Sequence, residues 1–235
     1  MSPLTTTTLH SSRSLYLRRT LPNDAPLLYT QAYSQREFMR LFRLNDSPAN
    51  EAEVYKQLWQ RQQSPPNQDR YLELLIVHRR YGPIGICALA EYIPLHRRAE
   101  YLIGLFKTQH RYVGYGLEAS LMILDLAFNT YRLHKLYAIT YAYNNHAQKG
   151  LLSLGFKLEG IQKEHIYDPV EQHFVDLHNY GMTETEFRHN QRLLPLAKHL
   201  LNRDITQAMP IEQPPQQASF IPSGVLTWCP SLEQH

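Results

Sequence analysis

The sequence has little cysteine, no long apolar run and no run of charge of one sign. Its 235 residues include two cysteines, Cys87 and Cys229, which are too few and too distant for a disulfide framework or a metal cluster. We therefore expect no metal and a reducing, cytoplasmic location. No apolar stretch approaches the ~20 residues of a membrane-spanning helix. Met1 to Arg13 is rich in Thr and Ser and lacks an apolar core, so no secretory signal peptide is expected.

Charge and hydrophobicity are both close to those of an ordinary globular protein. Lys and Arg number 24 against 21 Asp and Glu, which gives a net charge of +3. The basic residues occur as isolated pairs and form no basic arm, so we expect no nucleic-acid partner. Hydrophobic residues make up 43% of the chain, enough for a substantial core.

The spacing of apolar residues predicts two helices early in the chain, over residues 25–44 and 51–62, after a first strand over 15–19. Residues 71–79, 84–92 and 99–106 are rich in β-forming residues and are separated by tight turns, which indicates an antiparallel meander. The pattern then alternates. Helices are predicted over 116–131 and 147–154, and strands over 136–143, 156–161 and 174–181. A meander followed by alternating helices and strands is typical of an α/β domain with a mixed sheet.

Composition divides the chain into four parts. Residues 1–13 are expected to be a disordered leader, and residues 14–187 the folded domain. Residues 188–207 predict a helical extension, which Pro195 should bend or split. Residues 208–235 carry several prolines and are expected to form an extended or disordered tail.

The most informative local feature is the loop between a strand and a helix, from Gln109 to Gly116. Gly114 and Gly116 allow the backbone to approach a ligand closely, and the N–H groups at the start of a helix favour an anion such as a pyrophosphate. Arg111 would add a charged contact. Neither a Walker motif nor a dinucleotide fingerprint is present. Two glycines before a helix also occur in plain tight turns, so the loop alone does not decide the function.

Three motifs together resemble the GNAT superfamily of N-acyltransferases. Arg111-x-x-Gly114-x-Gly116 resembles its Arg/Gln-x-x-Gly-x-Gly/Ala motif, and Asn144-x-x-Ala147-x-x-x-Leu151-x-x-x-Gly155-Phe156 is similar to its second motif. Arg98-Ala99-Glu100 resembles the strand entry of the branch that acetylates ribosomal proteins, which also contains polyamine acetylators. The resemblance covers about residues 14 to 187.

This resemblance implies the GNAT fold, with a central mixed and splayed β-sheet flanked by helices, followed here by the C-terminal helical extension and tail. It implies acyl-CoA as co-substrate and no metal. The pantetheine would pair with the strand Leu102 to Phe106, and the pyrophosphate would lie on the amides of Arg111 to Gly116. The implied donor-binding residues are Leu105, Phe106, Arg111, Tyr112, Val113, Gly114, Tyr115, Gly116, Asn144, Ala147 and Lys149.

The catalytic residues are less clearly marked. Direct transfer needs a base for the attacking amine, and Glu100 and Glu91 are the candidates because both lie on strands beside the expected cleft. Glu100 has an alternative structural role, paired with Arg97 or Arg98. Asn144 is expected near the thioester. Many members of the superfamily carry a proton-donating Tyr where this chain has Leu151, so another group must take over that task.

The motifs do not identify the acceptor or the acyl group. A peptide or protein amine is the first hypothesis and a small-molecule amine the second. Acetyl is the default acyl group, although Gly104 could leave room for a longer fatty chain and the leucines of residues 193–201 could cover one or only pack the extension. A GNAT-like module that binds acyl-CoA without catalysis is the competing class. Either a monomer or a homodimer is compatible with the sequence.

Overall fold

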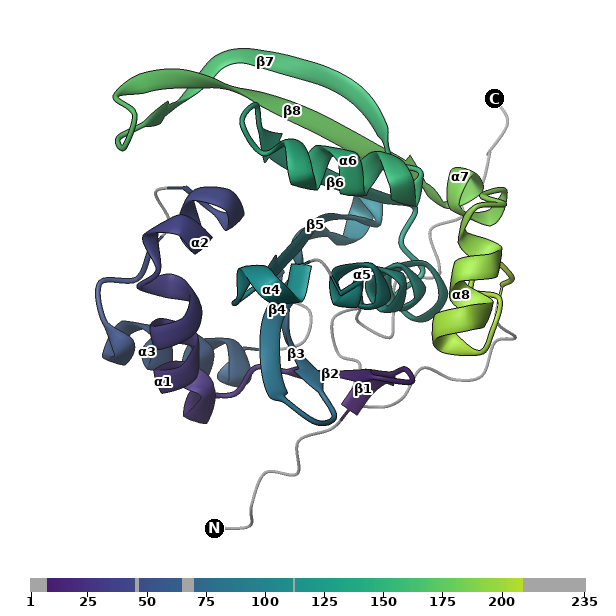
Figure 1. Ribbon diagram of the computed structural model, residues 1–235, viewed down its shortest axis with the longest axis horizontal. Coiled ribbons are helices and arrows are strands. Elements are labelled where there is room, and N and C mark those ends of the chain that lie inside the picture. The colour runs from purple at the N-terminus through teal and green to yellow at the C-terminus, as the bar shows by residue number, and fades with distance from the viewer. Residues whose placement is uncertain (1–7, 45–46, 65–69, 112, 209–235) are drawn as a thin grey trace, which may run out of the picture.

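The computed structural model describes residues 8–44, 47–64, 70–111 and 113–208. Its central element is an eight-stranded sheet in the order β1-β2-β3-β4-β5-β6-β8-β7 (Figure 1). Neighbouring strands run antiparallel except for β5 and β6, which are parallel. This mixed sheet with helices around it confirms the predicted α/β class. The strands are β1 (Thr8–Ser11), β2 (Leu15–Arg19), β3 (Leu72–His78), β4 (Gly82–Ile93), β5 (Arg98–Leu105), β6 (Lys135–Tyr141), β7 (Lys157–Asp168) and β8 (His173–Thr183).

The helices cover both faces of the sheet (Figure 1). None of those in the described part of the chain is long and apolar enough to cross a membrane. The α-helices are α1 (Ala25–Leu28), α2 (Arg36–Phe42), α3 (Glu51–Gln63), α4 (Thr108–Arg111), α5 (Tyr115–Asp125), α6 (Asn145–Leu154), α7 (Glu184–Arg188) and α8 (Leu193–Leu201). Short 3-10 or π-helical segments are η1 (Pro22–Asp24), η2 (Tyr29–Tyr33), η3 (Pro94–His96) and η4 (Leu126–Thr130).

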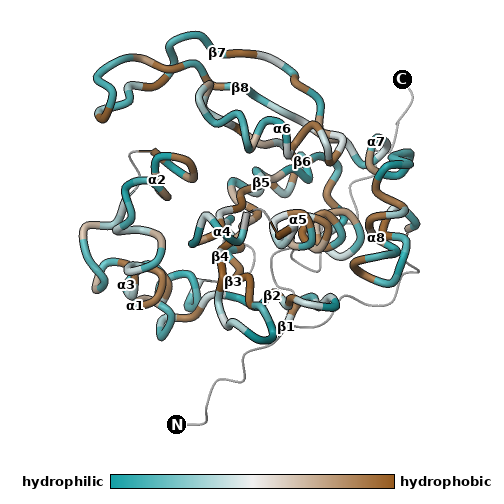
Figure 2. The backbone as a smooth tube through the Cα atoms, viewed as in Figure 1, coloured by the Kyte–Doolittle hydropathy of each residue, from teal (hydrophilic) through white to brown (hydrophobic). Residues whose placement is uncertain are grey.

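Strand β4 shows why the chain forms two hydrophobic clusters. Successive side chains of a strand point to opposite faces. Ile86 and Ala88 therefore join the cluster beneath α1, α2 and α3, while Cys87 and Leu89 join the larger cluster beneath α5, α6 and α8. Figure 2 shows hydrophobic stretches of β3, β4 and α5 at the centre of the molecule.

The sheet is splayed between β5 and β6. These strands pair over Arg98–Lys135, Ala99–Leu136 and Glu100–Tyr137, and the pairing ends there. Beyond this point β5 stays bonded to β4 as far as Leu105, while β6 stays bonded to β8 as far as Tyr141. The two halves of the sheet thus diverge, which confirms the splayed sheet implied by the sequence.

The N-terminal region differs from the sequence expectation. Thr8–Ser11 form β1 and pair with β2, whereas residues 1–13 were expected to be a disordered leader; residues 1–7 lie outside the described part. Two buried carboxylates of α5 explain why this region is ordered. Asp125 accepts a hydrogen bond from His10 at 2.5 Å, and Glu118 accepts one from the Ser12 hydroxyl at 2.6 Å. Composition could not reveal these distant partners.

Two further predictions needed adjustment. The single helix expected over residues 25–44 is divided into α1, η2 and α2, with a break at Ser34 and Gln35. The final hairpin is longer than expected: β7 runs to Asp168 and β8 begins at His173. Its twelve-residue strand β7 is largely exposed, so the apolar periodicity that marks a core strand is weak there.

The extension after residue 187 is helical, as predicted, but it is divided before Pro195. Helix α7 ends at Arg188 and α8 begins at Leu193. Pro195 lies in the first turn of α8, where its missing N–H needs no intrahelical partner. Leu193, Ala197 and Leu201 are buried in the cluster that contains α5. The leucines therefore pack the extension onto the domain. The expected tail, residues 208–235, lies outside the described part apart from residue 208.

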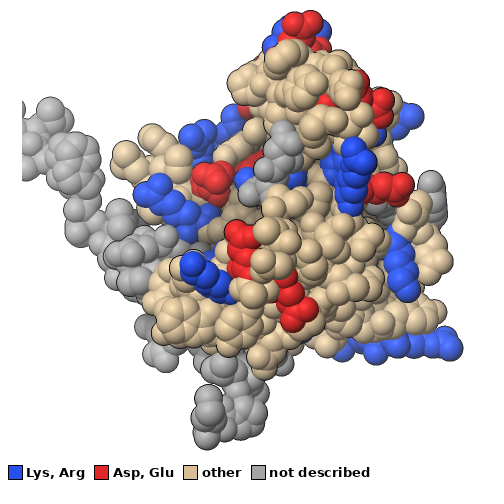
Figure 3. All heavy atoms as spheres, turned by 90° about the vertical axis from the view of Figure 1, so that its left-hand side faces the viewer, with Lys and Arg blue, Asp and Glu red and all other residues tan. Residues whose placement is uncertain are grey.

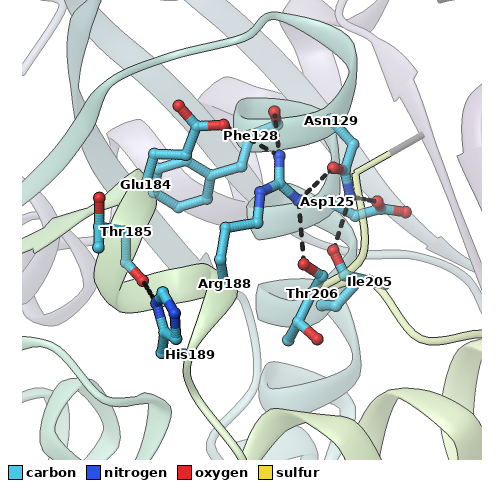
Figure 4. Close-up of polar contacts among 9 residues, drawn as sticks. All are labelled: Asp125, Phe128, Asn129, Glu184, Thr185, Arg188, His189, Ile205 and Thr206. Carbon is cyan, nitrogen blue, oxygen red and sulfur yellow. Dashed lines mark hydrogen bonds and ion pairs between the residues drawn. The ribbon is translucent and has the colours of Figure 1, made fainter. Parts of the chain in front are cut away.

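A buried polar network fixes this extension (Figure 4). Arg188 of α7 donates to Asn129 Oδ1 at 2.6 Å and to the carbonyl oxygens of Phe128 and Thr206 at 3.2 and 3.3 Å. The Asn129 amide donates in turn to Asp125 Oδ1 at 2.8 Å and to the Ile205 carbonyl at 2.7 Å. Residues 205 and 206 are thereby tied to η4, which follows α5, so residues 188–206 form an integral part of the folded domain.

Candidate functional site

The divergence of β5 and β6 opens a cavity of about 340 Å³ between the two halves of the sheet. Helix α2 closes it on one side, and α5 and α6 border it on the other. Its walls are mostly apolar, with a few polar groups. The residues that line it include Phe38, Phe42, Tyr101, Gly104, Leu105, Gly114, Gly116, Ser120, Thr140, Asn144, Ala147 and Leu151.

The glycine loop lies at one end of this cavity. Gly114 has a left-handed φ of +90° and is the N-cap of α5, where it provides no capping side chain. The first N–H groups of a helix have no intrahelical acceptor, so those of α5 are free to bind an anion. A Cβ added to Gly116 would come no closer than 3.7 Å to the surrounding protein. Packing within the protein therefore does not require glycine at position 116, which is consistent with close approach by a ligand.

The predicted donor-binding residues fall into separate groups. Leu105, Gly114, Gly116, Asn144 and Ala147 line the cavity. Phe106, Val113 and Tyr115 instead line a neighbouring hollow on the other side of the loop. Lys149 is exposed on α6 and is absent from the cavity wall. Arg111 ends α4, and Tyr112 lies outside the described residues.

Two aromatic residues of α2 limit the width of the cavity. A Cβ added to Gly104 would lie 2.5 Å from Phe38 Cζ and 3.1 Å from Phe42 Cδ2. Phe38 is held by Phe42 and Phe106, with ring centroids 5.2 and 6.1 Å apart. The space beside Gly104, suggested above for a long acyl chain, is therefore filled by phenyl rings. Phe38 lies within the helix predicted over residues 25–44, but no local sequence pattern indicates that it reaches β5.

Glu100 occupies the last paired position before β5 and β6 diverge. Its carboxylate is buried and accepts a hydrogen bond from Arg43 at 2.8 Å. The structural partners expected from the sequence were Arg97 and Arg98; the observed partner comes from the region just after α2, which no local pattern could indicate. Burial raises the pKa of Glu100 above its ordinary value, although Arg43 opposes the shift and Glu91 adds to it.

Glu91, the second candidate base, lies on a β-bulge of β4 with a left-handed φ of +49° and an exposed side chain. It is close enough to Glu100 to raise the pKa of that carboxyl. Neither Glu91 nor Glu100 is among the residues that line the cavity. The structure therefore brings the two predicted carboxylates near each other but leaves Glu91 in solvent.

Asn144 is placed at the cavity wall, but both ends of its amide contact the protein. Its oxygen caps α6 by accepting from the Ala147 N–H at 3.2 Å, and its nitrogen donates to the Leu41 carbonyl at 3.4 Å. Nearby, the Tyr143 hydroxyl donates to the Arg40 carbonyl at 2.8 Å, and the Leu44 N–H donates to the Tyr141 hydroxyl at 2.7 Å. The C-terminal end of α2 is thus tied to the far half of the splayed sheet.

A salt-bridge network extends this connection to the β7–β8 hairpin. Arg40 contacts the buried Asp168 at 2.9 Å and Glu171 at 3.2 Å, and it stacks over the Tyr143 ring at 4.5 Å. Asp168 also accepts from the Val170 N–H at 2.9 Å. Burial raises the pKa of Asp168, but the hydrogen bonds from Val170 and Arg40 outweigh it and leave that pKa below its ordinary value. These contacts hold α2 against the half of the sheet that contains β6, β7 and β8.

Comparison with known proteins agrees with this architecture. Residues 14–157 match the family model described as acetyltransferase (GNAT) domain. No curated protein matches the chain. A spermidine N-acetyltransferase from Vibrio cholerae, solved in complex with CoA and spermine, aligns with a TM-score of 0.66 and 19% identity over 74% of this chain and 97% of that chain. A spermidine/spermine N-acetyltransferase from the same organism, in complex with manganese ions, aligns with a TM-score of 0.64 and 17% identity over 76% and 97%. Identities this low establish a shared fold and leave the acceptor open.

Proposed function

The chain belongs to the GNAT acetyltransferase family, and on that premise we propose that it transfers an acetyl group from acetyl-CoA to the primary amine of a peptide or protein. The observation that carries the choice of acceptor is that three buried carboxylates beside α2 and α3 are each paired with an arginine of that region. Glu100 is paired with Arg43, Asp168 with Arg40, and Glu73 with Arg61. A polycation needs several carboxylates without such partners, whereas a single amine needs one base.

The chain has groups that fit acetyl-CoA. Beyond Glu100, the edge of β5 that faces β6 pairs with no strand in the described structure, so its backbone groups are open to an amide-bearing chain. The start of α5 provides N–H groups for a pyrophosphate, with Gly114 and Gly116 at the cavity wall. In this proposal, Leu102 to Phe106 hold the pantetheine and Val113 to Gly116 the pyrophosphate.

The proposed acyl group is acetyl because of the two phenyl rings beside Gly104. Phe38 and Phe42 are buried and in close contact with β5, which leaves little room for a long chain there. Helix α8 does not line the cavity, and its leucines pack on α5. A longer acyl chain would have to displace side chains that are already packed.

In the proposed reaction Glu100 is the base. It lies on the face of β5 that α2 covers, as Leu102 and Gly104 do, so an amine approaching from this face reaches the open edge of β5. Its raised pKa improves its capacity to accept a proton from an ammonium group. Glu100 takes one proton from the ammonium group and passes it to solvent. The neutral nitrogen then forms a bond to the thioester carbon, the carbon–sulfur bond breaks with its electron pair going to sulfur, and the second proton lost by nitrogen goes to Glu100.

Surface charge supports a peptide or protein acceptor. Figure 3 shows the side of the molecule that carries α1, α2 and α3, where acidic and basic groups are interspersed. A peptide can use such a mixed surface, because its backbone and side chains offer both donors and acceptors.

A small-molecule amine is the second candidate acceptor. It is favoured by the fold similarity to spermidine N-acetyltransferases, which extends over almost the whole length of those proteins. Under this alternative the buried pair of Glu100 and Arg43 would bind a monoamine with an anionic substituent rather than a polyamine.

Thiol release from acetyl-CoA distinguishes these acceptors. Peptides with different N-terminal residues, lysine-containing peptides blocked at the N-terminus, spermidine and simple monoamines would be compared at equal concentration. We expect the highest kcat/KM with a peptide amine and the acetylated product by mass spectrometry. A higher kcat/KM with spermidine than with every peptide would overturn the assignment of the acceptor.

A further inference from the structure

Many members of the superfamily carry a tyrosine hydroxyl where this chain has Leu151. The departing sulfur therefore needs another hydrogen-bond donor in this protein. Four hydroxyl-bearing residues line the cavity: Tyr101, Ser120, Thr140 and Ser153. Tyr101 and Ser120 are 2.6 Å apart, and Ser120 also donates to the Gly116 carbonyl at 2.6 Å. Ser153 donates to the Gly150 carbonyl at 2.7 Å. These three hydroxyls are already engaged.

The fourth hydroxyl group, that of Thr140, is not engaged in this way. The residue is only 6% exposed, and its Oγ1 has no hydrogen-bond partner among the described residues. Buried hydroxyl groups are nearly always hydrogen-bonded in folded proteins, so an exception next to a cavity indicates a partner that arrives with a ligand. The residue lies on β6, within the segment that has diverged from β5.

The topology places this hydroxyl on the same wall as Leu151. Side chains alternate along β6: the Tyr141 hydroxyl contacts Leu44 near α2, whereas Ala138 packs in the cluster that contains Leu151. Thr140 has the same parity as Ala138 and therefore points toward α6.

The register of α6 over β6 supports the same placement. The Gln148 amide donates to the carbonyl oxygens of Tyr141 and Ala142 at 3.1 Å each, which fixes α6 over the end of β6. From residue 148, Leu151 lies about 4.5 Å further along the helix. That advance equals one to two residues of a strand at about 3.3 Å per residue, and Leu151 and Thr140 both line the cavity.

We propose that the Thr140 hydroxyl is a catalytic group that donates a hydrogen bond to the departing sulfur of coenzyme A. The inference rests on the proposed function, since it requires the thioester to lie in this cavity. The amine nitrogen forms its bond to the carbonyl carbon, and the carbon–sulfur bond breaks with its electron pair going to sulfur. Thr140 stabilises the resulting thiolate without losing its own proton, and the proton from nitrogen goes to Glu100.

Binding measurements isolate the contact with sulfur. The affinity for CoA and for desulfo-CoA would be measured by calorimetry in the wild type, Thr140→Val and Thr140→Ser at a pH above the pKa of the thiol. We expect the wild type and Thr140→Ser to prefer CoA about tenfold, as for a hydrogen bond to a charged group, and Thr140→Val to lose this preference. Equal weakening of both ligands in Thr140→Val would mean that the hydroxyl contacts another part of the ligand, and would overturn the proposal.

Turnover provides the second readout. Thr140→Val should lower kcat about tenfold with little change in the KM for acetyl-CoA, and Thr140→Ser should restore most of it. Thr206→Val, which alters a buried threonine in the extension, controls for the cost of replacing a hydroxyl elsewhere. A Thr140→Val enzyme with wild-type kcat would refute the role. If no tested amine is acetylated, the acceptor assignment fails, while the ratio of CoA to desulfo-CoA binding still decides the role of Thr140.

Discussion

At the scale of single residues, the carboxylate of Glu100 combines burial with a nearby guanidinium group, and the two have opposite effects on its protonation. Burial dominates and raises the pKa of Glu100. A base with a raised pKa is ionised, and therefore active, only above that pKa, so kcat/KM should fall as the pH is lowered through it. This descending limb should begin at a higher pH than for an ordinary glutamate.

Substitution of Glu100 by Gln tests this role. We expect kcat to fall about 100-fold, as is typical for loss of a general base, and the acidic limb of the pH profile to disappear. Glu91→Gln, measured alongside it, should have a much smaller effect because Glu91 is exposed on a bulge. If Glu100→Gln retains the wild-type pH profile, the carboxylate serves only to hold Arg43.

Phe38 is predicted to determine the length of the acyl group. Its ring lies against Gly104 in the cavity wall, so Phe38→Leu should open space beside β5. We expect the ratio of kcat/KM for hexanoyl-CoA to that for acetyl-CoA to rise about tenfold, the scale on which pockets distinguish methylene groups. Phe174→Leu is the matched control, because Phe174 is exposed on β8 and does not line the cavity. An unchanged ratio would show that another part of the wall sets the limit.

At the scale of elements, we predict that the salt bridges of Arg40 hold α2 in its position beside the gap between β5 and β6. Arg40→Gln would leave the buried Asp168 without its guanidinium partner, and removal of one partner from a buried pair is costly. We expect loss of about 1–3 kcal/mol in the free energy of unfolding. We also expect a higher KM for the acceptor, since α2 borders the cavity. Arg36→Gln, on the exposed side of the same helix, should change neither quantity. Chemical denaturation and steady-state kinetics measure the two effects, and equal behaviour of both variants would contradict this role of Arg40.

Sequence patterns were sufficient for elements with a regular apolar face. The meander, the helix after the glycine loop and the strand with Leu136 were all predicted, because local periodicity reports burial. β1 was missed because its His10 contacts Asp125, and the adjoining Ser12 contacts Glu118, both more than 100 positions away. The long exposed β7 was predicted too short for a related reason, since pairing with β8 stabilises it rather than apolar burial.

The residues of the candidate site also fall into two groups, those that local sequence can indicate and those that depend on tertiary contacts. Gly114 and Gly116 could be found from sequence because glycine before a helix has a specific backbone meaning. Phe38, Arg43 and Thr140 could not, because their importance arises from contacts across the fold. Glu100 was found as a carboxylate near a strand end, but its partner on the α2 side was not. Tertiary contact, rather than local propensity, decides these roles.

At the scale of the whole molecule, one buried carboxylate connects the two ends of the described chain. Asp125 is completely buried and contacts His10 of β1, and it also forms an ion pair with Arg203 beyond α8. Burial, with Arg203 adding to it, lowers the pKa of His10 from 6.5 to about 4.

This pKa predicts how stability depends on pH. As the pH falls below 6.5 the unfolded chain takes up a proton on His10, whereas the folded chain does so only near pH 4. The unfolded state thus binds more protons between these two pH values. The contribution of His10 to the free energy of unfolding is therefore fully present above pH 6.5 and decreases as the pH falls toward 4. The loss from this one group should be about 3 kcal/mol. Thermal unfolding across this range measures it. His10→Gln, which keeps a neutral donor toward Asp125, should remove that part of the pH dependence, while His189→Gln on the exposed side of the extension should retain it. Identical pH profiles for the wild type and His10→Gln would show that His10 does not link β1 to the extension through its neutral form.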